Sequence, residues 1–333
     1  MIINLNIQIF IFLCINKLNM KIYFFNLAHI GDSVFSKPCI AEFVYQNPKN
    51  DIYLFVLYNW FFFSDIPNLK MLHNVENDEN VENDENVVNN DNYRLWQDFF
   101  STYSKEAFFV IEDSLYINTW IGGNNYLNAN NSVAECDIKI MIEYFQNLII
   151  KINELFKLDL KFNIPSYTKL LELPTTDITA FLLYKKNKKI IFYYNLYPRS
   201  GQRFPIQNHE NIILFLSETF KDYIICCALP TNIMKHNVIS LEIFGYYPTP
   251  CCKNVTQYVY IAMECEYVFS YDIGACFLYV NNLFNEKFNG KWFHVTSNLQ
   301  YYDKFIKYLQ NINIIKCQVS NEEELTNFIK YLQ

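Results

Sequence analysis

The chain has 333 residues, of which 51% are hydrophobic, and a formal net charge of −7. This length allows two domains, and the apolar share is sufficient for a sizeable core. Seven acids within residues 74–92 account for the whole negative charge. The rest of the chain is neutral, which argues against a nucleic-acid binder held by phosphate contacts.

Residues 1–19 contain the apolar run Ile7–Ile15. This run is too short for a membrane span, which needs about 20 residues. A signal peptide would require a basic start and a small-residue cleavage site, and neither is present. We therefore interpret residues 1–19 as an extension, either non-native or an extra edge strand, rather than as an export signal.

The segment from Met20 to Pro48 predicts a strand, a glycine turn and a helix. Lys21–Asn26 is an apolar and aromatic run typical of a buried strand, and apolar residues recur at helical spacing from Ser33 until Asn47-Pro48. A second strand is expected over Ile52–Leu57. In such β-α-β units, ligands bind at the carboxyl ends of the strands, so Asp32 is a candidate site carboxylate. The alternative is that Asp32 only caps the helix.

Residues 74–92 hold the acidic unit NVENDE twice and then a decayed copy, NVVNND. Such sequences bury too little apolar surface to order, so we expect a disordered acidic insert. A calcium loop is less consistent with the repeat, which lacks the EF-hand glycine and spacing. Further along, Phe108–Ile111 predicts a strand and Ile138–Phe156 a long amphipathic helix.

Prolines and a run of lysines indicate a linker over residues 171–188, between a first domain of residues 20–170 and a second of residues 189–319. The second domain repeats the α/β alternation. Its expected strands are Lys189–Asn195, Tyr223–Leu229, Val238–Phe244, Tyr267–Tyr271 and Trp292–Val295, and its expected helices are His209–Phe220, Val255–Cys265, Ala275–Asn282 and Tyr301–Gln310. Ser320 is expected to cap a C-terminal helix in residues 320–333, with three glutamates in its first turn. The prediction is an α/β protein with two Rossmann-like domains facing a central cleft.

Two segments of the second domain could bind phosphate. The loop after its first strand contains Arg199, Ser200, Gly201, Gln202 and Arg203, and arginine forks suit phosphate oxygens. The later segment consists of Asp272, Ile273, Gly274 and Ala275. A glycine at a helix start lets a diphosphate approach backbone amides, and Asp272 could accept hydrogen bonds from sugar hydroxyls. The alternatives are an ordinary loop with solvated arginines and an ordinary capped helix.

Motifs for other chemistries are absent from the sequence. No GxGxxG follows either first strand, and no P-loop or GxSxG elbow occurs, which disfavours a dinucleotide-dependent oxidoreductase, a P-loop NTPase and an α/β-hydrolase. The ten cysteines include the pairs Cys226-Cys227 and Cys251-Cys252 but no CxxC. We interpret them as buried, reduced thiols of a cytosolic protein, and we expect no metal site.

Together these segments resemble the heptosyltransferase-like glycosyltransferases of family 9, which have the GT-B fold. The resemblance covers roughly residues 20–310. It rests on Ile30-Gly31-Asp32 with Pro38 and Pro48, on Gln202-Arg203-Phe204-Pro205, and on Asp272-Ile273-Gly274. The sequence departs from the family at Gln202, where the family has lysine, at Ile273, where it has a hydroxyl residue, and at Phe277, where it has histidine.

The resemblance implies an inverting, metal-independent glycosyltransferase without a cofactor, in which a nucleotide-diphosphate sugar is the donor and a glycan or lipid-linked glycan the acceptor. Asp32 would be the general base, with His29 and Gly31 beside the acceptor. Arg199, Arg203 and the amides near Gly274 would meet the leaving diphosphate. The implied setting is lipopolysaccharide or surface-glycan synthesis in the cytoplasm, with peripheral contact to the cytoplasmic face of a membrane left open.

Two other functions stay open on the residues alone. The departures at Ile273 and Phe277 are compatible with a GT-B-like protein that binds a nucleotide or glycan without catalysis. A sugar-nucleotide epimerase of the same fold is the other alternative.

Overall fold

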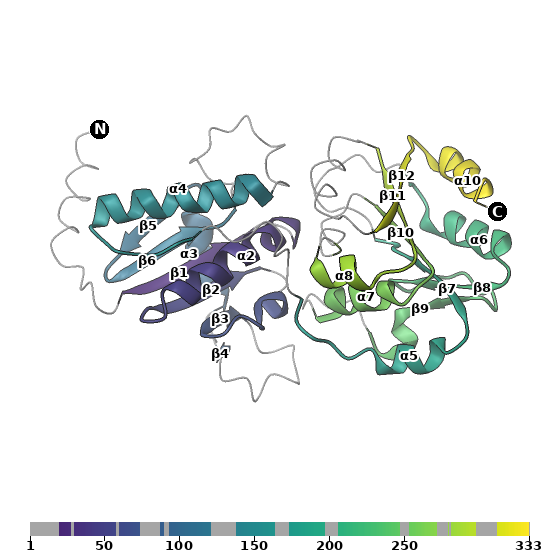
Figure 1. The fold of residues 1–333 in the computed structure, drawn as a ribbon, viewed down its shortest axis with the longest axis horizontal. Coiled ribbons are helices and arrows are strands. Elements are labelled where there is room, and N and C mark those ends of the chain that lie inside the picture. Colours follow the sequence, from purple (N-terminus) through teal and green to yellow (C-terminus); the bar gives the residue numbers. More distant parts are fainter. Residues whose placement is uncertain are drawn as a thin grey trace. The chain divides into compact units, whose positions relative to one another are not determined.

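The computed structural model describes residues 20–27, 30–57, 60–73, 87–89, 93–120, 138–163, 173–196, 206–246, 253–271, 279, 281–297 and 312–332. The chain divides into two compact units, residues 1–167 and 168–333. Each unit is built on a six-stranded sheet with helices on both faces (Figure 1). The prediction of two Rossmann-like α/β units is therefore confirmed.

The sheet of the first unit is parallel except at one edge. Its strands, in spatial order, are β4 (Val87–Asn89), β3 (Leu69–His73), β2 (Asp51–Val56), β1 (Lys21–Asn26), β6 (Ser114–Asn118) and β5 (Phe108–Ile111). Only β5 pairs antiparallel among the described strands of this sheet. The helical segments are α2 (Ile30–Gln46), η1 (Trp60–Phe63), α3 (Tyr93–Thr102) and α4 (Ile138–Phe156).

Alternating side chains of β1 pack against helices on opposite faces of this sheet. Phe24 packs edge-on against Phe43 of α2, with ring centroids 5.1 Å apart, whereas Phe25 stacks on Phe100 of α3 at 4.7 Å. Aromatic pairs in these arrangements add to the burial of their area. The strand is thus covered on both faces, as its continuous apolar run predicts.

The second sheet is entirely parallel. Its strands, in spatial order, are β12 (Asn313–Gln318), β11 (Lys291–Thr296), β10 (Tyr267–Tyr271), β7 (Lys189–Tyr193), β8 (Tyr223–Cys227) and β9 (Val238–Ser240). The helical segments are α5 (Thr179–Lys185), α6 (His209–Thr219), η3 (Leu241–Phe244), α7 (Lys253–Met263), α8 (Asn282–Lys287) and α10 (Glu322–Lys330). Numbered along the chain, this is the strand order 3-2-1-4-5-6 of a dinucleotide-binding Rossmann sheet.

Several predicted boundaries need correction. Helix α2 already begins at Ile30, so Gly31 and Asp32 lie in its first turn rather than before it. The predicted strand Val238–Phe244 ends at Ser240, and the following residues form η3, which stops at Gly245 with a left-handed φ of 78°. The predicted helix Ala275–Asn282 is wrong at its end, because Asn281 is extended and caps α8 with its side chain.

Three segment assignments also change. The expected disordered insert includes β4, because Val87 and its neighbours pair in register with β3. The expected linker contains α5, whose Phe181 packs against Phe244 of η3, so this part belongs to the second unit. The C-terminal helix is confirmed, but its cap is Asn321, whose side chain accepts from the Glu324 amide, and not Ser320. Residues 1–19, 74–86, 90–92 and 301–310 lie outside the described residues.

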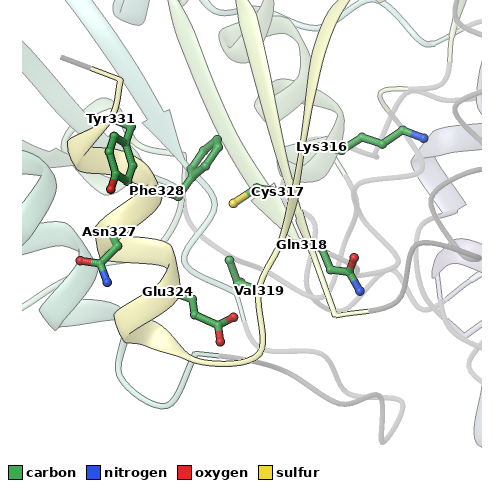
Figure 2. A pocket seen from close by; sticks show the side chains of 8 residues that line it. All are labelled: Lys316, Cys317, Gln318, Val319, Glu324, Asn327, Phe328 and Tyr331. Atoms are coloured by element: carbon green, nitrogen blue, oxygen red, sulfur yellow. The ribbon is translucent and has the colours of Figure 1, made fainter.

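The five described cysteines are free, buried thiols, as the sequence predicts (Cys39, Cys226, Cys227, Cys265 and Cys317). Burial raises the pKa of each of these thiols. Cys317 lines a groove between β12 and α10, and Figure 2 shows its sulfur directed toward Phe328. Cys317 is 2% exposed, and burial raises the pKa of its thiol to about 12.

Because the thiolate is the reactive form, we expect these five cysteines to alkylate at least about 100-fold more slowly in the native protein than in urea. Iodoacetamide labelling at pH 8, followed by peptide mass spectrometry, measures each position. Cys317 is the most demanding case because it borders a groove. Native labelling of Cys317 at the rate seen in urea would contradict the assigned burial.

Candidate functional site

The strand order reverses in the second sheet between β7 and β10. These two strands are parallel neighbours, with Tyr193 beside Phe269, and the chain continues from β7 toward β8 on one side and from β10 toward β11 on the other. Ligands of open α/β sheets bind outside the carboxyl ends of strands at such a reversal. The candidate donor segments begin here, since residues 197–205 follow β7 and residues 272–275 follow β10.

The predicted donor residues themselves lie outside the described residues. This applies to Arg199, Ser200, Gly201, Gln202 and Arg203, and to Asp272, Ile273, Gly274 and Ala275. The described strand and helix ends nevertheless bring the origins of the two segments to adjacent strands of one sheet edge. The expectation that they serve one ligand is consistent with this placement and stays a prediction.

Buried polar side chains hold the carboxyl edge of this sheet together. Tyr271 donates to the Tyr193 hydroxyl at 2.7 Å, and that hydroxyl lies 2.8 Å from Nδ1 of His209, the first residue of α6. Beside them, the Asn195 side chain forms two hydrogen bonds with the backbone of Leu229, donating at 3.1 Å and accepting at 2.7 Å. The ends of β7, β8, β10 and α6 are therefore linked by directional contacts.

A carboxylate from the C-terminal helix meets the start of α6. Glu322 accepts hydrogen bonds from the backbone amides of Gln207, at 2.6 Å, and Asn208. It also accepts from the Asn211 side chain at 3.3 Å. Helix N-termini favour anions. In this chain, α10 thus supplies an anion to the amides just before α6.

His209 is held in its neutral form. The residue is 4% exposed, and burial lowers the pKa of its imidazole to about 4, against the smaller raising effects of a hydrogen bond with the Leu196 backbone and of the Glu322 charge. Desolvation disfavours the charged ring, because a buried ion loses the stabilisation of water.

The first unit has the same reversal, between β1 and β6. Here the Asn26 side chain donates to Thr119 Oγ1 at 3.1 Å, and the Thr119 amide donates to the Phe25 carbonyl at 2.9 Å. Asn26 and Thr119 are fully buried. These contacts join the carboxyl ends of β1 and β6, which border the start of α2.

The candidate base Asp32 is the third residue of α2, and Gly31 is the second; their side-chain surroundings and the whole of His29 lie outside the described residues. One turn further, buried Lys37 pairs with Asp65 at 2.6 Å and lies over the Phe62 ring, with its nitrogen 4.5 Å from the centroid. These contacts connect the first half of α2 to the segment that follows β2. The helix that carries Asp32 is thereby fixed at the carboxyl edge of the sheet.

No family model matches the chain, and no curated protein matches it. Among solved structures, it is similar to a glycosyl transferase of family 9 from Veillonella parvula, with 12% identity, a TM-score of 0.43, and coverage of 94% of this chain and 90% of the other. It is also similar to E. coli ADP-heptose LPS heptosyltransferase II, with 10% identity, a TM-score of 0.47, and coverage of 94% and 99%.

A third similar structure is the E. coli heptosyltransferase WaaC with ADP, with 10% identity, a TM-score of 0.40, and coverage of 94% of this chain and 97% of the other. Among the residues that the structure describes, no group of histidine, cysteine, aspartate or glutamate could hold a metal ion, and no helix is long and apolar enough to cross a membrane.

Sequence reasoning missed the polar groups at the sheet edge. His209 is the first residue of a predicted helix and directly follows the capping residue Asn208. This position at a helix start is the sequence feature that could have indicated a role for His209. Tyr193 and Tyr271 are two of 26 tyrosines, so only the strand register brings them together.

The low pKa of His209 predicts that stability depends on pH. In the unfolded chain the imidazole titrates near 6.5, whereas in the folded chain it stays neutral until about pH 4. Between these values the unfolded state binds one more proton. The resulting stability is fully present above pH 6.5 and is lost as the pH falls toward 4, by about 3 kcal/mol in total.

Denaturant unfolding of the full chain at pH 7 and pH 4.5 measures this loss. His209→Gln should flatten the dependence, while His236→Gln, which alters an exposed histidine of the same unit, should keep it. An equal pH dependence in wild type and His209→Gln would refute the assignment.

Proposed function

We propose that the protein is a heptosyltransferase-like glycosyltransferase of the GT-B type. It would transfer a sugar from a nucleotide-diphosphate sugar to a glycan or lipid-linked glycan, with inversion and without a metal. The observation that carries this proposal is the pair of strand-order reversals, one per unit. At one, the helix with Asp32 follows β1, and at the other, the arginine segment and the Asp272-Ile273-Gly274 segment follow adjacent strands.

In the proposed reaction, Asp32 removes the proton of an acceptor hydroxyl. The hydroxyl oxygen then bonds to the anomeric carbon, and the bond from that carbon to the diphosphate oxygen breaks. Negative charge grows on the leaving diphosphate, where Arg199, Arg203 and amides near Gly274 stabilise it. Asp272 would orient the donor's hydroxyls, and His29 would contact the acceptor.

The proposal extends to the setting of the reaction. A protein that uses a nucleotide-sugar donor and a surface-glycan acceptor would act in the cytoplasm, with peripheral contact to the cytoplasmic face of a membrane if the acceptor is lipid-linked. Neither a cofactor nor nucleic acid takes part in the proposed chemistry. The donor sugar is left unassigned, because Gln202 and Ile273 differ from the residues that the family uses beside the donor.

A second function is favoured by a specific feature of the sequence. Ile273 and Phe277 replace polar residues of the family's late motif, so a protein that binds the nucleotide sugar without transferring it is the alternative. Incubation with a panel of ADP-, GDP-, UDP- and CDP-sugars and candidate glycan acceptors separates the two. Transfer yields a nucleoside diphosphate and an elongated acceptor, whereas simple binding yields neither.

Asp32→Asn should lower the transfer rate by about 10²- to 10⁴-fold, the usual contribution of a general base. The affinity for the donor should stay unchanged, because the donor is assigned to the other unit. Nucleotide release and donor calorimetry measure the two effects. Asp98→Asn, at an exposed acid of α3 in the same unit, is the matched control, and normal turnover by Asp32→Asn would exclude Asp32 as the base.

A further inference from the structure

Three buried side chains form one hydrogen-bonded row at the carboxyl edge of the second sheet. Tyr271 of β10 donates to Tyr193 of β7 at 2.7 Å, and the Tyr193 oxygen lies 2.8 Å from His209 Nδ1 of α6. Tyr193 and Tyr271 are fully buried, and their rings meet edge to face, with centroids 5.9 Å apart. We call these three residues the Tyr-Tyr-His row.

The hydrogen bonds of the row run in one direction. Tyr271 uses its proton toward Tyr193, so the Tyr193 proton is available for Nδ1 of a neutral His209. A neutral ring whose Nδ1 accepts this proton carries its own single proton on Nε2, so we assign that tautomer to His209.

The residues of the row flank the two candidate donor segments in the sequence. Leu196 is the last described residue before residues 197–205, and His209 follows that segment as the first residue of α6. Tyr271 is the last residue of β10, directly before Asp272. The row therefore ties both ends of one segment to the beginning of the other.

Packing of the two tyrosine rings does not by itself require that their hydroxyls form hydrogen bonds. Tyr258 of α7 shows the contrast, since it is equally buried and its hydroxyl has no hydrogen-bond partner in the part of the chain that the structure describes. A buried hydroxyl without a partner has a desolvation cost, whereas each hydroxyl in the row is satisfied by a neighbour. The row is thus a connected network of buried polar groups.

We propose that Tyr193, Tyr271 and His209 are positioning residues that hold the starts of the two segments at the spacing a nucleoside diphosphate requires. This inference rests on the proposed function, because it assigns the diphosphate to those segments. Binding groups that are held in place before the ligand arrives lose less conformational freedom on binding. The row acts through the segments and does not touch the donor.

The test uses the full-length protein and the substitutions Tyr193→Phe and Tyr271→Phe. Tyr258→Phe is the matched control, because it removes a buried hydroxyl of the same unit that has no described partner. Calorimetry well below the unfolding temperature gives Kd for ADP, GDP, UDP and CDP, and for the nucleoside matching the best of them. The thermal unfolding midpoint is recorded for each variant.

We expect Tyr193→Phe, which breaks two links, to weaken binding of the best diphosphate by about 10-fold, and Tyr271→Phe, which breaks one, by less. The affinity for the nucleoside without phosphates should not change, and Tyr258→Phe should bind like the wild type. A row that only stabilised the fold would alter the unfolding midpoint and leave the ratio of nucleoside to diphosphate Kd unchanged.

The outcomes separate this inference from the function on which it rests. If the wild type binds a nucleoside diphosphate and both row variants bind it equally well, the positioning role is overturned and the proposed function stands. Equal weakening of nucleoside and diphosphate would also overturn the positioning role. If the wild type binds none of the four diphosphates, both proposals fail together.

Discussion

The parallel pairing of β7 with β10 is the constraint on which the candidate donor site depends. Parallel strands require crossover connections, and all carboxyl ends of such a sheet lie along one edge. Because the chain leaves β7 toward β8 and returns on the other side at β10, two segments far apart in sequence begin at neighbouring strand ends. A sheet with another strand order would separate them, however suitable their arginines and glycines.

The alternation of side chains along β7 and β10 then decides which residues face α6 at this edge of the sheet. Tyr193 and Tyr271 face His209 of α6, whereas the neighbouring Phe192 contacts Tyr258 of α7 on the opposite face. A shift of one residue in either strand would reverse these faces and place the tyrosine hydroxyls away from α6. The polar row is therefore a direct consequence of register.

Much of the framework follows from periodicity, while the site depends on contacts that periodicity does not encode. Ile138–Phe156 and Tyr267–Tyr271 form a helix and a strand at their predicted bounds, because each has a long or continuous apolar pattern. The helix expected over Ala275–Asn282 failed at Asn281, where a capping side chain outweighs the apolar pattern. Val87, within an acidic repeat, joins the sheet because β3 offers a partner, and no local signal reports that pairing.

The two units stabilise equivalent positions with different chemistry, and the difference bears on their proposed roles. In the first unit, an amide and a hydroxyl, Asn26 and Thr119, join β1 to β6 next to the helix of Asp32. In the second, two phenols and an imidazole join β7 to β10 and extend the connection to α6. The proposed general base is one carboxylate on one helix, next to a link between two strands. The proposed diphosphate site combines two separate segments, and the longer connection of the second unit lies where both of them begin.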